Sequence, residues 1–130
     1  MGQKAEALGI DSTAIGQQSV ASGDNSMALG TQARATGDRS IALGSKSKAS
    51  GKKSAALGAD SKATGFQSTA IGYGARARRD HEIAVGTRAS SYRLRGLAPG
   101  GSFVGSKYQN SGDKRIVTTD DSGTLGTTDF

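Results

Sequence analysis

Residues 26–30 read Ser-Met-Ala-Leu-Gly, and this five-residue pattern returns every fourteen residues over the first two thirds of the chain. The pattern is a serine, a variable residue, an alanine, then an isoleucine or leucine, and a glycine. Further copies lie at 12–16, 40–44, 54–58, 68–72 and, with glutamate replacing serine and valine replacing leucine, at 82–86. Polar half-repeats that also end in glycine, such as Ser-Lys-Ala-Ser-Gly at 47–51, lie midway between them. Six periods in register indicate a repeat architecture.

Each segment is short, alternates in residue type, and is closed by a glycine. A helix would lose about 1 kcal/mol at every such glycine, whereas a short strand followed by a tight turn accommodates it. Two five-residue strands in every fourteen residues describe one coil of a parallel β-solenoid, and coils stack at about 4.8 Å. The sequence therefore predicts an all-β roll of six coils.

Alternation along the strands places small residues on one side and larger residues on the other. The small residues suit the inside of a narrow roll. The expected roll interior comprises Ser26, Ala28, Gly30, Ser40, Ala42 and Gly44. The alternative arrangement, with isoleucine and leucine inside, would leave alanine and glycine on both outer faces.

In the preferred arrangement, large apolar residues point out of the roll from the first strand of every coil. They are Ile15, Leu29, Ile41, Leu43, Leu57, Ile71, Ile83 and Val85. A continuous exposed apolar stripe marks an interaction surface, and identical stripes match in register. The sequence therefore predicts self-association through this stripe.

The formal net charge is +6, and the excess lies within residues 1–93, with thirteen Lys and Arg against seven Asp and Glu. Four cations fall on the outward side of the second strand. They are Arg34, Lys48, Lys62 and Arg76. A basic column favours acidic partners such as sulfated glycans, although a solvated face is the simpler alternative. Specific nucleic-acid binding is less favoured, because none of the three Phe and three Tyr residues interleaves with this column.

The composition argues against catalysis, cofactors and metals. The chain has no Cys and one His, and its many serines fall on inward repeat positions without a paired histidine. Its apolar runs are only a few residues long, and no signal peptide leads the chain. We therefore expect a non-enzymatic chain that, if the natural protein is exported, is a fragment of it.

The motif Asn-Ser-Met-Ala-Leu-Gly at 25–30, with its polar half-repeat, resembles the head (Hep/Hag) repeat of YadA-like trimeric autotransporter adhesins. The resemblance covers about residues 5–91. It implies a left-handed parallel β-roll and a parallel homotrimer, with the apolar stripe as the trimer core. It also implies an extracellular passenger held on a bacterial outer membrane by a separate C-terminal anchor. Such a passenger would attach to host cells or to extracellular matrix proteins of the collagen type.

Two other functions remain open at this point. One is a segment of a trimeric phage fibre or secreted fibre, which would share the roll and the trimer without a membrane anchor. The other is a basic solenoid that binds glycans or nucleic acid by itself.

The fourteen-residue period stops after residue 93. We predict a head over 1–93 and a small β-rich connector over 94–130. Within the connector, the sequence predicts a turn or hinge at Leu94–Gly101, strands at Ser102–Tyr108 and Lys114–Thr119, and a hairpin turn at 120–123 before Thr124–Thr127.

Overall fold

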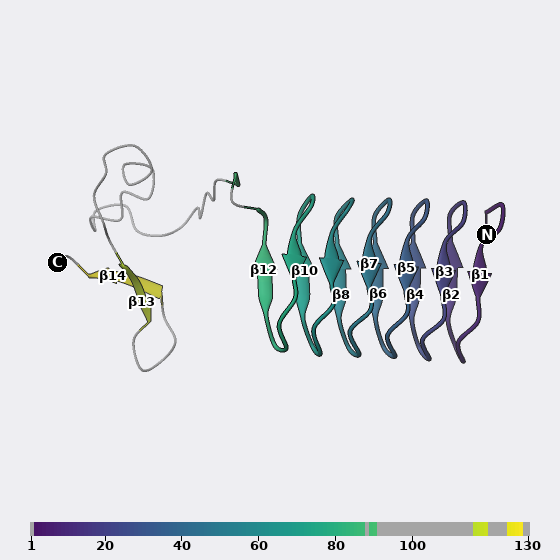
Figure 1. Cartoon of the computed structure of the whole chain (residues 1–130), viewed down its shortest axis with the longest axis horizontal. Helices are drawn as coiled ribbons and strands as arrows, with labels where there is room; N and C mark the ends of the chain where they lie inside the picture. The colour runs from purple at the N-terminus through teal and green to yellow at the C-terminus, as the bar shows by residue number, and fades with distance from the viewer. Residues whose placement is uncertain (1, 88, 91–115, 120–124, 129–130) are drawn as a thin grey trace. The chain divides into compact units, whose positions relative to one another are not determined.

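The computed structural model describes residues 2–87, 89, 90, 116–119 and 125–128. Over the repeats the chain winds into successive coils along one axis, and each coil after the first adds one strand to each of two parallel sheets (Figure 1). One sheet contains β1 (Glu6–Ala7), β3 (Val20–Ala21), β5 (Arg34–Ala35), β7 (Lys48–Ala49), β9 (Lys62–Ala63) and β11 (Arg76–Ala77). The other contains β2 (Thr13–Ile15), β4 (Met27–Leu29), β6 (Ile41–Leu43), β8 (Ala55–Leu57), β10 (Thr69–Ile71) and β12 (Ile83–Val85).

The register between coils is fourteen residues throughout both sheets. Ala28 pairs with Ala42, and Ala42 in turn pairs with Ala56. The predicted parallel β-solenoid with fourteen-residue repeats is therefore confirmed. The strands are shorter than the five-residue segments that predicted them, at three residues in one sheet and two in the other, because each segment bends into a corner at its end.

Tight turns with a left-handed residue form the corners. In the turn after β2, the Ser19 amide donates to the Gly16 carbonyl at 3.2 Å, and Gln18 adopts φ 57°. A positive φ at the third residue is the geometry of a type II turn, which glycine or asparagine usually occupies. Here most of these positions hold longer polar residues such as Gln18 and Gln32, although Asn25 and Gly74 follow the usual preference. The backbone amides at these positions continue the ladder between coils: the Gln32 amide donates to the Gln17 carbonyl at 2.8 Å. These inter-coil hydrogen bonds offset the cost of the left-handed backbone.

The core of the roll consists of small side chains. Its wholly buried residues are alanines such as Ala28 and Ala42, and the largest fully buried side chains are serines. Ser26 is 2% exposed and Ser40 is fully buried. The two sheets therefore approach too closely to admit a leucine or isoleucine between them.

Gly30 and Gly44 differ from the sequence expectation that they lie inside the roll. They lie half-buried at corners with φ 133°. A Cβ built on Gly30 would approach the carbonyl carbon of Gly44 to 2.7 Å. These glycines are therefore required by the close stacking of successive coils along the axis, rather than by the width of the roll.

The chain divides after Ser90 into two units, three residues before the predicted boundary. In the second unit, β13 (Ile116–Thr119) pairs with β14 (Leu125–Thr128) in an antiparallel ladder. These strands begin two residues and one residue later than the sequence predicted. The predicted hinge at 94–101, strand at 102–108 and turn at 120–123 lie outside the described residues, and the connector role stays a prediction. Within the described ranges, no helix is long and apolar enough to span a membrane.

Candidate interaction surfaces

The outer face of the sheet that runs from β2 to β12 carries the large apolar side chains. Two columns of side chains line this apolar face. In each strand, one column residue directly precedes the inward alanine and the other directly follows it. The first column contains Ile15, Leu29, Leu43, Leu57, Ile71 and Val85, and the second contains Thr13, Met27, Ile41, Ala55, Thr69 and Ile83. Ile15, Leu43 and Ile71 are 42%, 43% and 39% exposed, whereas Leu29 and Leu57 are half-buried. The structure thus excludes the alternative in which these side chains fill the roll.

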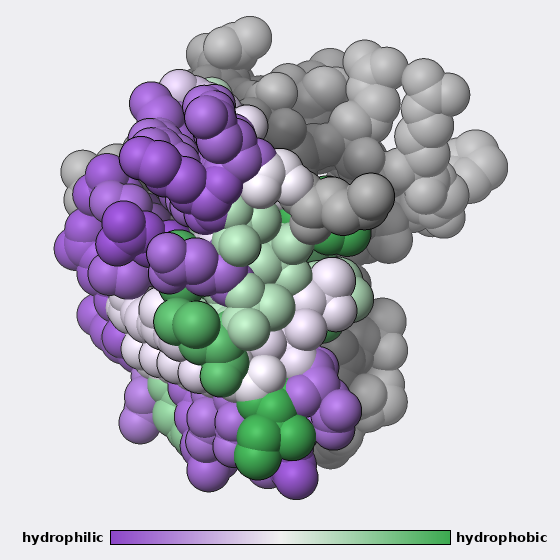
Figure 2. Space-filling model, turned by 90° about the vertical axis from the view of Figure 1, so that its right-hand side faces the viewer, coloured by the Kyte–Doolittle hydropathy of each residue, from purple (hydrophilic) through white to green (hydrophobic). Residues whose placement is uncertain are grey.

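The outer face of the other sheet carries the basic column of Arg34, Lys48, Lys62 and Arg76. The first two pair across β5 and β7, and the last two across β9 and β11. All four side chains are exposed, and they point to the side of the roll opposite the apolar face. Towards the N-terminus, Val20 and Glu6 continue the same column, so its positive charge begins at the third coil. In the end view of Figure 2, strongly hydrophilic residues cover the left side of the roll and part of its lower edge.

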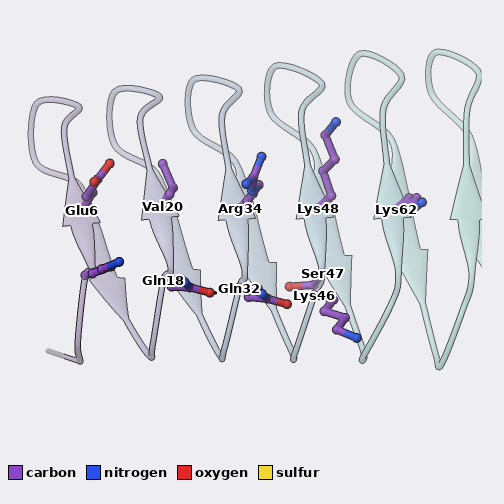
Figure 3. Close-up of a pocket in the computed structure, with 10 residues that line it drawn as sticks. Glu6, Gln18, Val20, Gln32, Arg34, Lys46, Ser47, Lys48 and Lys62 are labelled. Atoms are coloured by element: carbon purple, nitrogen blue, oxygen red, sulfur yellow. Dashed lines mark hydrogen bonds between the residues drawn. The ribbon is translucent and has the colours of Figure 1, made fainter.

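A groove of about 570 Å³ runs beside the basic column (Figure 3). Its lining combines column residues with residues of the adjoining corner. They are Lys4, Glu6, Gln18, Val20, Gln32, Arg34, Lys46, Ser47, Lys48 and Lys62. In Figure 3, the Lys48 side chain points upward from β7, whereas the Lys46 side chain points downward from the preceding corner. The side-chain Nε2 of Gln32 donates to the side-chain Oε1 of Gln18 at 3.1 Å, which links two successive coils at this corner.

The opposite corner, which follows the two-residue strands, has mixed charge. There Lys52 pairs with Asp38 at 3.4 Å between Nζ and Oδ2, which is the one ion pair among the described residues. Asp80 Oδ1 accepts a hydrogen bond from the Phe66 amide at 2.8 Å. The Phe66 ring stands edge-on to His81 at 5.5 Å between centroids, with Lys53 Nζ 6.0 Å from the ring centre. This corner therefore neutralises part of its own charge, whereas the basic column does not.

The last coil departs from the repeat at two positions: the sequence analysis identified Glu82 in place of serine but not Arg79 in place of glycine. In every earlier coil, the residue two positions after the two-residue strand is a glycine. A Cβ on Gly65, for example, would collide with the carbonyl oxygen of Arg79 in the next coil. Arg79 takes that position after β11, and among the described residues no strand follows β11 in its sheet. Glu82, in place of the repeat serine, accepts hydrogen bonds from the amides of Arg78 and Arg79 at 2.7 and 2.8 Å. The replacement of glycine by arginine at 79 was the readable signal for the end of the stack.

The two amide hydrogen bonds, first that of Arg79 and then that of Arg78, hold the pKa of the Glu82 carboxyl below its usual value. The positive charges of both arginines act in the same direction, and only desolvation opposes them. Glu82 therefore stays ionised at neutral pH and satisfies backbone donors that would otherwise face solvent at the end of the sheet.

The hydroxyls of the inward repeat serines are directed into the structure. Those of Ser19, Ser47 and Ser68 donate to the carbonyl three residues earlier, at 2.7–2.9 Å. Those of Ser12, Ser26 and Ser40 are buried without a hydrogen-bond partner. Buried hydroxyls are inaccessible to a substrate. Across the described part of the chain, no group of three or more His, Asp or Glu residues could hold a metal ion.

Comparison with known families and structures gives two findings. The family model of the YadA head domain repeat (2 copies) matches residues 1–19, 7–33, 21–47, 35–61, 49–75 and 63–89. Among curated protein sequences, none matches the chain.

Among solved structures, the crystal structure of the collagen-binding domain of Yersinia adhesin YadA has a similar fold. The two share 24% sequence identity and a TM-score of 0.50, over 77% of this chain and 79% of that one. At this identity the likeness concerns the fold. It agrees with the two-sheet roll built from the repeats.

Proposed function

Because this chain belongs to the family of YadA head domain repeats, we propose that it is a head segment of a homotrimeric adhesin displayed on a bacterial cell surface. The observation that carries the proposal is the apolar face, whose first column is an unbroken row of Ile, Leu and Val from β2 to β12, while the roll interior holds only small residues. A roll that places its largest apolar side chains outside needs a partner to cover them.

The gain from covering the first column is substantial. Full burial of a large aliphatic side chain contributes about 1.5–3 kcal/mol, and these side chains are already somewhat more than half buried in one chain. Six of them therefore offer roughly 4–8 kcal/mol per chain as an upper estimate. The best partner is a second copy, because every copy carries the same columns at the same spacing. The number of copies in the assembly, three, is what membership of the family implies.

Trimer formation through the apolar face leaves the opposite sheet and its corner free to meet ligands. We propose extracellular matrix proteins of the collagen type as ligands, since the structurally similar Yersinia domain is a collagen-binding domain. Three copies around one axis would strengthen weak contacts by avidity. The roll itself supplies no catalytic group, and its proposed role is attachment.

Light scattering on the purified chain tests the assembly. We expect about three chain masses for the native protein. Replacing Leu43 and Leu57 together by Asp should yield monomers or unfolded chains, because the carboxylates would be buried without partners at the interface. The matched control, Ser22→Asp with Thr36→Asp, adds the same charge to exposed positions on the other sheet and should keep the native mass. A native protein that remains monomeric at micromolar concentration would contradict the proposal.

Binding to immobilised collagen tests the ligand. The native protein should bind, and the Leu43→Asp, Leu57→Asp variant should lose retention with its multivalency. A trimeric native protein that fails to bind collagen would remove collagen-type proteins as ligands while leaving the assembly intact.

A further inference from the structure

We propose that the basic groove binds a linear sulfated polysaccharide, lying along the axis of the roll. This inference rests on the proposed attachment function, because such polysaccharides are components of the extracellular matrix. It concerns a different face from the one proposed for trimer formation, so both surfaces can be used at once.

Charge supports this ligand. The groove is lined by five cations, Lys4, Arg34, Lys46, Lys48 and Lys62, and by one carboxylate, that of Glu6. None of these cations takes part in the ion pair found among the described residues, which joins Lys52 and Asp38 on the other corner. Their charge is therefore available to an external anion, which would also relieve the repulsion between cations on neighbouring coils.

The groove has the geometry of a site for a chain rather than for a small anion. Its column residues occupy one position per coil, with Arg34 paired to Lys48 and Lys48 paired to Lys62 across parallel strands. Their backbones are thus about 4.8 Å apart along the axis. Arg76 continues the column by one further coil beyond the groove. A polymer with regularly repeated anionic groups can follow this row, whereas a single sulfate or phosphate would meet only one or two of its cations.

The remaining lining favours a sugar over a nucleic acid. Gln18 and Gln32 contribute side-chain amides, which can both donate to and accept from hydroxyl and sulfate groups. No aromatic residue lines the groove, and proteins that bind single-stranded nucleic acid gain much of their affinity from stacking on aromatic rings. Sulfated sugars need no such platform.

Heparin serves as the probe, and a matched pair of variants of the whole chain provides the test. The column variant combines Arg34→Ser, Lys48→Ser, Lys62→Ser and Arg76→Ser. The control variant combines Arg39→Ser, Lys52→Ser, Lys53→Ser and Arg79→Ser, which removes the same number of arginines and lysines from the opposite corner. All eight side chains are exposed, so both variants should fold and assemble like the native chain.

We expect the column variant to lose about tenfold or more in affinity for heparin, and the control to change by about twofold or less. The column variant should also show a shallower fall of affinity with rising salt, because fewer cations release counterions. Equal losses in the two variants would overturn the proposal, since binding would then follow net charge alone. Unchanged binding in the column variant would overturn it as well.

A gain of affinity provides an independent check. Glu6→Lys extends the column at its acidic end and should raise the salt concentration at which the protein elutes from heparin. An unchanged or lower elution point would contradict the proposed path of the polymer along the column.

Two further probes decide between ligand classes. Desulfated heparin should bind at least about tenfold more weakly than heparin, because the sulfates supply most of the charge. Single-stranded DNA that bound as tightly as heparin, with the same sensitivity to the column variant, would overturn the assignment to a polysaccharide.

Collagen binding, measured on the same variants, separates the two proposals. If the column variant loses heparin binding and keeps collagen binding, the result supports a separate glycan groove. A native protein that binds collagen but not heparin would overturn only this inference.

Discussion

The two sheets of the roll share an interior and differ completely on their outer surfaces. Inside, both present alanines: Ala42 and Ala49, one from each sheet, are fully buried in the same coil. Outside, the flanking residues are Ile41 and Leu43 on one sheet and Lys48 on the other. The interior is thus set by the narrow space between the sheets, whereas the outer positions are free to vary. The inward residues of each strand therefore set the fold, and the alternate outward residues form the two proposed interaction surfaces.

The largest effect should come from enlarging an inward residue. Ala49→Leu adds three heavy atoms where no space exists, and its cost should exceed the roughly 1–3 kcal/mol typical of overpacking, because the surrounding alanines cannot make room by changing rotamer. In a roll whose entire core is alanine and serine, we expect it to prevent folding. Far-UV circular dichroism and thermal melting measure the loss.

The neighbouring outward position provides the control for that change. Lys48→Leu introduces the same side chain on the exposed surface and should alter stability by less than about 0.5 kcal/mol. Similar melting temperatures for the Lys48→Leu and Ala49→Leu variants would contradict the assignment of inward and outward positions.

A smaller effect should follow from a single added methyl group along the axis. In Gly51→Ala the new Cβ would collide with the carbonyl oxygen of Gly65 in the next coil. The backbone must move to relieve the contact, and we expect a loss of about 2–3 kcal/mol in the free energy of unfolding. Chemical denaturation measures it, with Ser50→Ala as the neighbouring control. A Gly51→Ala variant as stable as that control would show that coils can separate without cost.

The smallest effect should occur at the end of the stack. Glu82→Ser restores the repeat residue but removes the acceptor for the amides of Arg78 and Arg79, so the melting temperature should fall modestly at neutral pH. The folded state lowers the pKa of Glu82, so its contribution is present above the usual glutamate pKa and is lost as pH falls through the lowered value.

Melting curves of the native chain and Glu82→Ser at several pH values test this dependence. The difference between them should be greatest near pH 7 and should shrink below about pH 4. A difference that stays constant down to the most acidic pH would assign the effect to packing rather than to ionised Glu82.

Much of the fold was readable because one spacing repeats. The period of fourteen predicted the coil, and alternation around Ala28 and Ala42 separated small residues from large ones. The strand lengths were overestimated, because a five-residue pattern does not reveal where its ends bend into a turn. Gly30 and Gly44 were placed inside the roll, since alternation cannot distinguish a glycine needed for width from one needed for stacking.

The corners could not be predicted from residue type. Left-handed positions are usually recognised by glycine or asparagine, yet here Gln18, Gln32 and Lys46 occupy them. Their conformation is maintained by hydrogen bonds to the preceding coil, which are long-range contacts without a local signal. The groove escaped prediction for the same reason, because it forms only when these corner residues lie beside the column of Arg34 and Lys48. The column itself, which alternation alone defines, was apparent.

Because each coil adds only one interstrand spacing along the axis, the roll is short for its number of residues. Fourteen residues advance the chain by about 4.8 Å, whereas the same residues would cover about 21 Å as a helix and about 46 Å as an extended strand. Many residues in the repeats therefore extend the structure by only a short distance. The repeats instead form a stack of closely spaced, nearly identical coils. Adding or deleting fourteen residues would lengthen or shorten both outer surfaces by one coil without changing their chemistry.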